Sequence, residues 1–435
     1  MHPLKQMIAR RINGEKCGIS SNCTANELVI EALLERGKVT GEPVLIEATA
    51  NQINQFGGYT GMVPQDFVDF VMKKVNQIGF PKSQLILGGD HLGPLVWSGE
   101  PEESAMSKAK ELVRLFVLAG FTKIHLDTSM KLADDPVDTI LSTEVIARRG
   151  VELYEVCLEA YEERLKTTPD ALRPVFIVGS EVPIPGGRQE VEEGVAVTLP
   201  SDFAETVHTY HKVFADRGHQ RAWEDVIAVV VQPGVEFGDD DVFLYDREAA
   251  ALLCNKLKEF EGIVFEGHST DYQTKELLSQ MVEDGIAILK VGPALTFGLR
   301  EALFSLARIE EELIEEDKRS DFINEMDRIM VENPGNWKKY YHGTPREIEL
   351  KRKYSFSDRC RYYFSMPEFV AVQNKLFENL SEIKIPLNIL HQYMPLQYEK
   401  VIRGEIEATP QALAKEGVLG FVYDYEVAVK SSEYI

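Results

Sequence analysis

Two histidines, each preceded by a glycine and an acidic residue within three positions, carry the clearest chemical signal in the sequence. His91 directly follows Asp90 in a Gly-Gly-Asp-His run, and His268 lies in a Glu-Gly-His run after another apolar segment. Two imidazoles brought together from different strands, with carboxylates nearby, form a site for one divalent ion, with Zn²⁺ or Mn²⁺ the expected metal. The alternative is a capping role for His91 and a satisfied buried ring for His268, but the pair together favours the metal.

Oxygen ligands and a proton-transfer group are also expected beside the two histidines. Glu181 and Gln232 each follow an apolar run and are the predicted oxygen ligands. Asp90 is the first choice for a general acid or base, because a neighbouring cation tunes the proton affinity of a carboxylate, and Glu181 is the second choice.

Further polar residues follow the apolar runs, where they can contact a substrate. A lysine at such a position needs a partner or a substrate, which makes Lys290 the most telling of them. The run Pro185–Arg188 can cradle an anion or form a simple turn, and the segment 354–364 can cover the site with arginines or form an ordinary amphipathic helix. The predicted substrate-binding residues are Asn51, Gln52, Asp127, Ser129, Arg188, Ser269, Asp271, Lys290 and Arg359.

Eight short β-branched runs alternate with amphipathic helical patterns between about residues 18 and 314. The runs are predicted as strands near 18–19, 43–47, 84–88, 122–127, 174–179, 225–232, 262–265 and 286–291. Alternating strands and helices require a parallel sheet, and eight such units are the number at which the sheet closes into an α/β TIM (β/α)8 barrel. A doubly wound open sheet is the rival, but no G-x-G-x-x-G follows the first strand.

The pattern changes after about residue 318, where the chain becomes helical and rich in aromatic residues. The sequence therefore predicts two parts. They are a barrel over 1–317 and a helical C-terminal extension over 318–435 that packs on the barrel.

Composition excludes several classes of function. The chain has 435 residues and a net charge of −23, which disfavours a nucleic-acid partner because phosphate backbones require excess Lys and Arg. No signal peptide and no run of about 18 apolar residues is apparent, so no membrane association is expected. Five scattered cysteines without a C-x-x-C pattern indicate a reducing, cytoplasmic environment.

Long stretches of the chain resemble the accessory-subunit family of class II tagatose-1,6-bisphosphate aldolases. The resemblance is carried by IEATANQINQFGGYTGM, LILGGDHLGP, KIHLDTSM, VGSEVPIPGG, VVVQPGVEFG, FEGHSTDYQT, ILKVGPALTFGLREALFSL, YSFSDRCRYYF and QYMPLQY, in one order over essentially the whole chain. It implies a TIM barrel. Some members are described as non-catalytic partners that stabilise a separate catalytic aldolase chain, whereas others resemble metal-dependent 4-epimerases of ketohexoses or their phosphates. A tagatose-6-phosphate kinase activity is sometimes attached to the family, but the chain has no G-x-x-x-x-G-K-[ST] loop.

A more distant similarity to the catalytic class II aldolases implies roles for individual residues. On that comparison Asp90 takes the place of the proton-transfer aspartate, and His91 and His268 take those of metal ligands. The aldolases carry another histidine after strand six, which residues 228–238 lack, so that Gln232 or Glu236 would have to substitute. Ser269-Thr270-Asp271 replaces their glycine- and serine-rich phosphate loop, which disfavours bisphosphate cleavage.

The polar strand ends favour an enzyme over a degenerate subunit, which would be free to lose them. We therefore expect a metal-dependent tagatose/fructose 4-epimerase with aldolase-like chemistry and no nucleotide cofactor, acting on a ketose or ketose phosphate. The alternative is a non-catalytic stabilising subunit of a class II tagatose-1,6-bisphosphate aldolase. A catalytic aldolase chain and a second copy of this chain are both possible partners.

Overall fold

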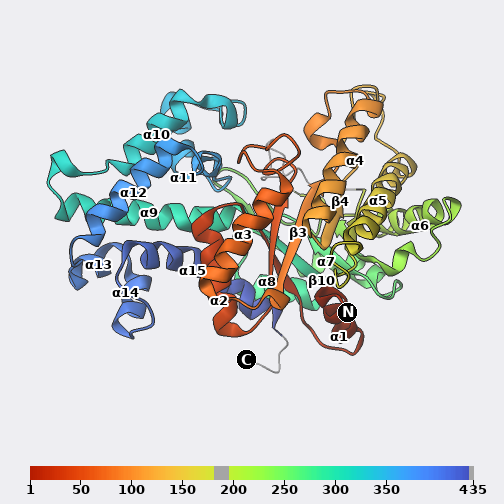
Figure 1. Ribbon diagram of the computed structural model, residues 1–435, viewed down its shortest axis with the longest axis horizontal. Coiled ribbons are helices and arrows are strands. Elements are labelled where there is room, and N and C mark those ends of the chain that lie inside the picture. The colour runs from red at the N-terminus through yellow and green to blue at the C-terminus, as the bar shows by residue number, and fades with distance from the viewer. Residues whose placement is uncertain (181–194, 431–435) are drawn as a thin grey trace.

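Eight parallel strands close into a barrel at the centre of the molecule. The computed structural model describes residues 1–180 and 195–430. The strands are β1 (Ile19–Cys23), β2 (Val44–Thr49), β3 (Leu85–Leu92), β4 (Lys123–Leu126), β5 (Val175–Val178), β6 (Val226–Val231), β9 (Val264–Gly267) and β10 (Ile286–Val291). They pair in the order β1-β10-β9-β6-β5-β4-β3-β2, which confirms the predicted fold class (Figure 1).

Helices follow the strands and cover the outside of the barrel, as the apolar periodicity predicts. Local signals set the ends of these helices. In α2 (Glu27–Thr40), for example, the side chain of Asn26 accepts hydrogen bonds from the backbone N–H groups of Leu28 and Val29, and Gly41 ends the helix with a φ of 72°. The helices up to the end of the eighth unit are α1 (Pro3–Ile12), α2 (Glu27–Thr40), α3 (Pro64–Ile78), α4 (Glu102–Ala119), α5 (Thr143–Leu165), α6 (Pro200–Asp216), α7 (Arg247–Leu257), α8 (Lys275–Glu283) and α9 (Pro293–Leu313).

Two features of the sheet differ from the prediction. β3 continues four residues beyond the predicted end at Gly88, so that Asp90 and His91 lie inside the strand and not after it. A short antiparallel hairpin, β7 (Glu236–Phe237) and β8 (Val242–Phe243), follows β6. The hairpin was not predicted because two-residue strands leave no periodic signal.

The barrel interior has an apolar floor and a charged upper layer. Leu45, Ile86, Ile177 and Ile288 fill the floor, and Leu4, Met7 and Ile8 of α1 pack against the same cluster. Above this layer, Glu47, Lys123 and Glu266 are fully buried within the strands. Buried charges of this kind must be paired or bind a ligand, which places the chemistry at the carboxyl ends of the strands.

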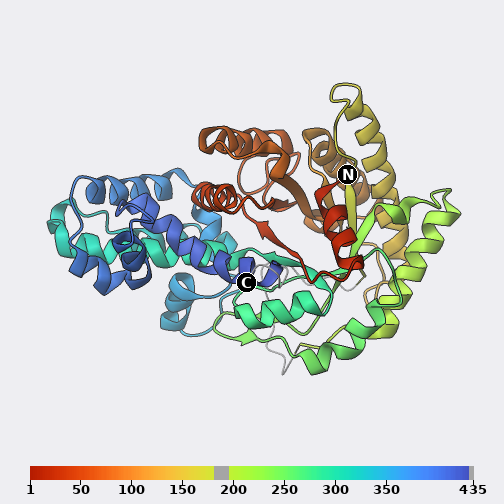
Figure 2. The ribbon, with the colours of Figure 1, turned by 90° about the horizontal axis from the view of Figure 1, so that it is seen from below.

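The C-terminal part of the chain is helical, and its last helix returns to the barrel. α9 extends away from the strands, and the helices that follow it, except the last, gather around its far end (Figures 1 and 2). They are α10 (Phe322–Glu332), α11 (Pro345–Tyr354), α12 (Pro367–Ser381), α13 (Leu387–Tyr393), α14 (Pro395–Ile402) and α15 (Pro410–Val429).

α15 completes the ring of helices around the barrel. It packs against α2, α8, α9 and β1, and the carbonyl of Val429 accepts a hydrogen bond from the N–H of Gly18 before β1. The helices α9 and α15 approach closely because Gly298 faces Gly417: a Cβ on either would lie within 2.7 Å of the other's carbonyl oxygen. The division at residue 317 stays a prediction, and α15, which follows it in the chain, lies within the helix ring.

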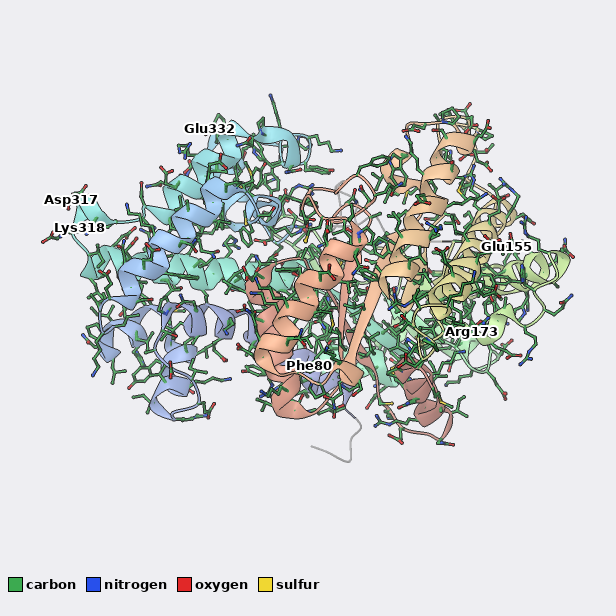
Figure 3. All side chains as sticks on the ribbon, in the orientation of Figure 1. Phe80, Glu155, Arg173, Asp317, Lys318 and Glu332 are labelled. Carbon is green, nitrogen blue, oxygen red and sulfur yellow. The ribbon has the colours of Figure 1, made fainter. Side chains whose placement is uncertain are left out.

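Figure 3 shows the side chains of the described residues, with Asp317, Lys318 and Glu332 on the C-terminal helical part and Glu155 and Arg173 on the opposite side of the molecule. None of the helices of residues 1–180 and 195–430 combines the length and the apolar run that crossing a bilayer requires.

Candidate active site

Three histidines and one aspartate meet at the carboxyl ends of β3, β4 and β9. Each of Asp90, His91, His125 and His268 offers one ligand atom, and these atoms lie within 4.8 Å of one another. The ring centroids of the three histidines are 4.9–5.2 Å apart. The structure therefore brings together Asp90, His91 and His268, which the sequence singled out, and adds His125.

His125 could have been found from the alternation of side chains along a strand. Lys123, His125 and Asp127 are two residues apart, so they point to the same face of β4 and its end. All three are buried. A strand of a parallel barrel that carries three polar residues on one face turns that face to the barrel interior, because the other face packs on helices.

Each imidazole is fixed through one ring nitrogen by a carboxylate. The three pairs are His91 Nδ1 with Asp127 Oδ2 at 2.8 Å, His125 Nδ1 with Asp90 Oδ1 at 3.0 Å, and His268 Nε2 with Glu266 Oε1 at 3.0 Å. A carboxylate that accepts the proton of one nitrogen leaves the lone pair of the other available, which is how proteins orient histidine ligands of metals. This leaves Nε2 of His91 and Nδ1 of His268 free. Nδ1 of His125 also accepts the backbone N–H of His91 at 3.2 Å, so Asp90 orients the ring without fixing its tautomer, and Nε2 of His125 has no partner among the described residues.

Two observations fit a divalent cation among these nitrogens. Nε2 of His125 is buried and has no hydrogen-bond partner among the described residues, which is costly unless something binds it. Four buried carboxylates around the rings face two buried ammonium groups among the described residues. Burial opposes protonation of His91, but Asp90 and Asp127 raise its pKa, so a charged His91 offsets one further carboxylate and one negative charge stays unbalanced. The groups counted are Glu47, Asp90, Asp127 and Glu266 against Lys123 and Lys290.

A chain of alternating charges, which we call the buried ion network, connects Asp90 to Glu266 through the barrel interior. Lys290 Nζ lies 2.7 Å from Asp90 Oδ2 and also contacts Glu47. Lys123 Nζ then lies 2.7 Å from Glu47 Oε1 and 2.6 Å from Glu266 Oε2. Gly88 makes room for this arrangement, because a Cβ there would lie 2.4 Å from Glu47 Oε1. The network therefore holds Glu266, which in turn holds His268.

The electrostatics keep Asp90 ionised and Lys290 protonated. Burial alone would raise the pKa of Asp90, but the charges of His91 and Lys290 hold it well below its usual range. Burial would lower the pKa of Lys290, but Asp90 and Glu47 raise it well above its usual value. Burial lowers the pKa of His268 to about 3, so this ring is neutral, as a metal ligand must be.

The backbone is strained at His91 and at the residue that follows His268. His91 has a φ of 48°, and Ser269, which follows His268, has a φ of 52°. Residues other than glycine rarely adopt this left-handed conformation, and such strain gathers where a side chain must be aimed at a ligand. The cost is consistent with a functional role for both positions.

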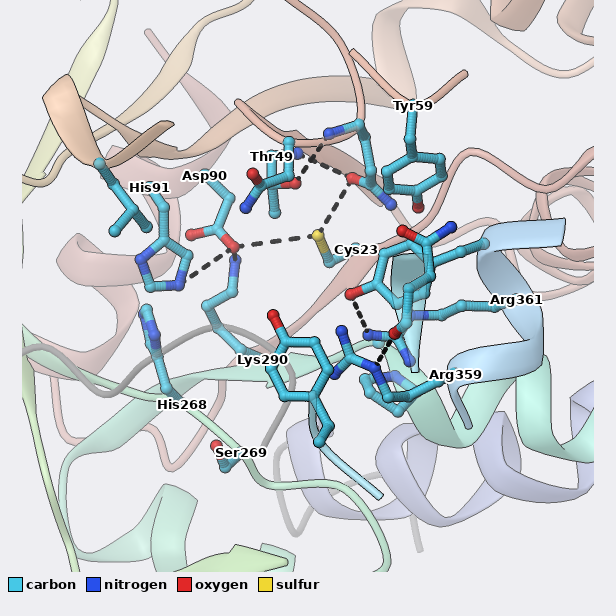
Figure 4. A pocket seen from close by; sticks show the side chains of 18 of the residues that line it. Cys23, Thr49, Tyr59, Asp90, His91, His268, Ser269, Lys290, Arg359 and Arg361 are labelled. Atoms are coloured by element: carbon cyan, nitrogen blue, oxygen red, sulfur yellow. Dashed lines mark hydrogen bonds and ion pairs between the residues drawn. The ribbon is translucent and has the colours of Figure 1, made fainter. Parts of the chain in front are cut away.

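A cavity of about 550 Å³ opens above the cluster (Figure 4). Six of the predicted substrate-binding residues line it: Asn51, Gln52, Ser269, Asp271, Lys290 and Arg359. Residues from the C-terminal part complete the wall, among them Asn336, Tyr340, Arg361 and Tyr362. The segment 354–364, which the sequence suggested as a cover, thus contributes directly to the cavity.

The other predicted site residues lie elsewhere. Asp127 stands behind His91, where its carboxylate also accepts a 2.7 Å hydrogen bond from the hydroxyl of Ser129, so both serve to position that ring. The amide oxygen of Gln232 accepts hydrogen bonds from the N–H groups of Gly234 and Val235 and shapes a turn there. The third imidazole of the cluster comes instead from His125 on β4. Glu181 and Arg188 lie outside the described residues.

Asp271 has a structural role besides lining the cavity. Its carboxylate accepts hydrogen bonds from the N–H groups of Gly292 and Ala294 at the start of α9, at 3.0 and 2.8 Å. Burial raises its pKa to about 6, although these hydrogen bonds oppose the shift. A carboxylate is an acceptor and repels a phosphate, and this one occupies the backbone N–H groups that could otherwise bind an anion.

Comparison with known proteins gives one consistent result. The family model described as D-tagatose-1,6-bisphosphate aldolase subunit GatZ/KbaZ-like matches residues 4–430. Proteins named D-tagatose-1,6-bisphosphate aldolase subunit GatZ from Salmonella agona and Salmonella dublin are 46% and 45% identical to the chain, covering 94% of it and 95% of each relative. A crystal structure of a probable tagatose 6 phosphate kinase from Sinorhizobium meliloti is 42% identical, with a TM-score of 0.86 over 94% of this chain and all of that one.

Proposed function

The chain belongs to the D-tagatose-1,6-bisphosphate aldolase subunit GatZ/KbaZ-like family, and from this membership we propose that it acts as a subunit of a class II tagatose-1,6-bisphosphate aldolase. The observation that carries the proposal is the extent of the match, which leaves only short ends of the chain and of its relatives uncovered. In this role the chain binds a separate catalytic aldolase chain and stabilises it.

The relatives support this role better than the epimerase activity that the sequence favoured. The argument for an enzyme was that a subunit without catalytic duties would lose its polar strand ends. The buried ion network weakens that argument, because Glu47, Lys123, Glu266 and Lys290 pair with one another inside the barrel. Removing one of them leaves an uncompensated buried charge, so the fold retains them whether or not catalysis occurs.

Co-expression with a catalytic class II tagatose-bisphosphate aldolase should raise the stability of that aldolase. A partner that binds only the native state at a hundred times its Kd stabilises it by about 2.7 kcal/mol. The measurement is the half-life of aldolase activity at elevated temperature, with and without this chain. Asp90→Asn is the informative variant, since it should stabilise the aldolase as well as the natural chain does. No change in half-life, and separate elution of the two chains on size exclusion, would refute the subunit role.

A second function, a metal-dependent ketohexose 4-epimerase, is favoured by one specific observation. Three imidazoles, each oriented by a carboxylate, converge beside an ionised aspartate at the end of a cavity of about 550 Å³. A metal bound there, Zn²⁺ or Mn²⁺, supplies a Lewis acid for the oxygen atoms of a ketose. His91, His125 and His268 would hold it. The same cavity is large enough for a sugar or its monophosphate.

The residues of the chain suffice for the proton transfers of such a reaction. Asp90 accepts the proton of the 4-hydroxyl group, the bond between carbons 3 and 4 breaks, and its electron pair moves into an enediolate over carbons 2 and 3. Carbon 4 becomes an aldehyde. When carbon 3 attacks the opposite face of that aldehyde, Asp90 returns the proton to the 4-oxygen and the configuration is inverted. Lys290 stays protonated beside Asp90 and balances its charge throughout.

Turnover of tagatose or fructose, free or phosphorylated, tests the epimerase function. Asp90→Asn should lower the rate by about 10²- to 10⁴-fold, as loss of a general base does. The exposed Asp216→Asn is the matched control and should be as active as the natural chain. Turnover in D₂O should leave the hydrogen on carbon 4 unlabelled, because that hydrogen never leaves its carbon. Deuterium at carbon 4 would instead demand direct proton abstraction there.

A further inference from the structure

Two arginines face the cavity without a carboxylate partner. Arg359 is only 7% exposed, and Arg361 is partly buried. Among the described residues neither forms an ion pair, and the carboxylate of Asp358, which precedes Arg359, is taken by Arg300 Nε at 3.0 Å and by the hydroxyl of Thr296 at 2.6 Å. A buried cation that lacks a counter-charge in the protein is costly unless a ligand provides that charge.

The hydrogen-bonding capacity of the two guanidinium groups is only partly used. Arg359 donates from Nε to the carbonyl of Asn336, and its two terminal nitrogens have no acceptor among the described residues. Arg361 donates to the carbonyls of Ser357 and Asp358 and to the hydroxyl of Tyr362 at 2.9 Å, and its Nε has no acceptor there. Planar N–H edges of this kind match the oxygen atoms of a phosphate group.

Aromatic rings fix the orientation of both guanidinium groups. The guanidinium carbon of Arg359 lies 3.4 Å from the ring centroid of Tyr340, and that of Arg361 lies 4.4 Å from that of Tyr362. Stacking occupies the faces of the guanidinium planes and leaves their edges for hydrogen bonds. A subsite preorganised in this way does not have to order two long side chains when a ligand binds.

The backbone conformation at Asp358 also directs Arg359 and Arg361 toward the cavity. Asp358 has a φ of 44°, and the cost of this left-handed conformation is offset by the contacts of its carboxylate with α9. The turn that results places Arg359 and Arg361 in the wall of the same cavity. Figure 4 shows them on the side opposite Asp90, His91 and His268, with Lys290 between the two groups.

The cavity is therefore bipolar, with excess negative charge at the histidines and uncompensated positive charge at the two arginines. A ligand that fits carries hydroxyl and carbonyl oxygens at one end, suited to a cation, and an anion at the other. We propose that Arg359 and Arg361 bind the phosphate of an open-chain ketose monophosphate whose sugar oxygens face the histidines. This assignment rests on the proposed function only because it takes the sugar to be a ketose. Lys290 does not form a second phosphate site, because its charge is already neutralised by Asp90 and Glu47.

Calorimetric titration of the full-length protein tests the subsite directly. The probes are D-tagatose 6-phosphate, D-tagatose, and D-tagaturonate, which carries a carboxylate in place of the phosphate-bearing carbon. The natural chain should bind the phosphate best. Arg359→Gln should weaken binding of the phosphate about 10- to 100-fold, as expected for loss of charge-assisted hydrogen bonds, and change the affinity for D-tagatose less than threefold. Arg359→Lys keeps the charge but loses the planar fork, and should show an intermediate loss.

Arg346→Gln is the matched control, because Arg346 lies in the same C-terminal part but is 71% exposed and pairs with Glu349. It should bind all three probes as the natural chain does. If Arg359→Gln weakens both sugars equally, if the natural chain prefers the carboxylate, or if it fails to bind the phosphate, the assignment is wrong. A chain that neither stabilises an aldolase nor turns over a ketose, but retains the Arg359-dependent preference for phosphate, would refute the proposed function and leave the subsite in place.

Discussion

Replacing any one of His91, His125 and His268 with alanine should remove stoichiometric divalent metal from the purified protein. Each ring supplies one nitrogen to the cluster, and loss of any one ring leaves two imidazoles and Asp90. Loss of an outer partner of a metal histidine already costs about 10- to 100-fold in affinity, so loss of the ring itself should cost on the order of a thousand-fold or more. Metal content by mass spectrometry and competition with a chelator measure the effect.

Two further variants sharpen this test. His208→Ala removes an exposed histidine of α6 and should leave the metal content unchanged. Asp127→Asn keeps the His91 ring but weakens its orientation, and should lower metal affinity by about 10- to 100-fold without abolishing it. Full metal content in all three alanine variants would show that these rings are not the ligands.

Lys123→Met should destabilise the protein by about 3–5 kcal/mol, because it breaks a fully buried ion pair and leaves Glu47 and Glu266 with less compensation. Methionine has a similar length, so a change in packing contributes little. The deficit should be smaller when the protein is loaded with a divalent cation, since the cation replaces part of the missing positive charge. Denaturant midpoints measured with and without metal give the loss of unfolding free energy and the part of it that a bound cation restores.

The control for this variant is Lys110→Met on α4. Lys110 pairs with Glu152 at 2.8 Å, but its side chain is 40% exposed, and a surface pair contributes about 0–1 kcal/mol. Equal stability of the Lys123→Met and Lys110→Met variants would mean that the buried ion network does not support the barrel.

The sequence was sufficient for the architecture and for part of the site. Eight apolar runs and the helices between them predicted the barrel, because period and element length survive in local sequence. Asp90, His91 and His268 were found because acids and histidines next to glycine are unusual at strand ends. Asp127 and Ser129 were found too, but they bind His91 and each other instead of lining the cavity.

Other features depend on the register between strands, which no single strand encodes. Lys123 and Glu266 are far apart along the chain, and their contact requires the closed barrel. His125 is absent from the predicted site, since only the convergence of β3, β4 and β9 places it beside the other two rings. Likewise, nothing local in residues 410–429 indicates that this helix contacts the barrel between α8 and α2.

Because α15 belongs to the helix ring but lies at the end of the chain, the ring is completed only after the rest of the barrel has been synthesised. The eighth strand, β10, ends at Val291, whereas the helix that closes the ring ends at Val429. At about 5–20 residues per second, a ribosome takes on the order of ten seconds to add the intervening segment. During this time the flanks of α2 and α8 lack the side chains of Leu413, Val418 and Val422 that later cover them. Until translation delivers this helix, the apolar residues of α2 and α8 that it covers therefore stay exposed to solvent.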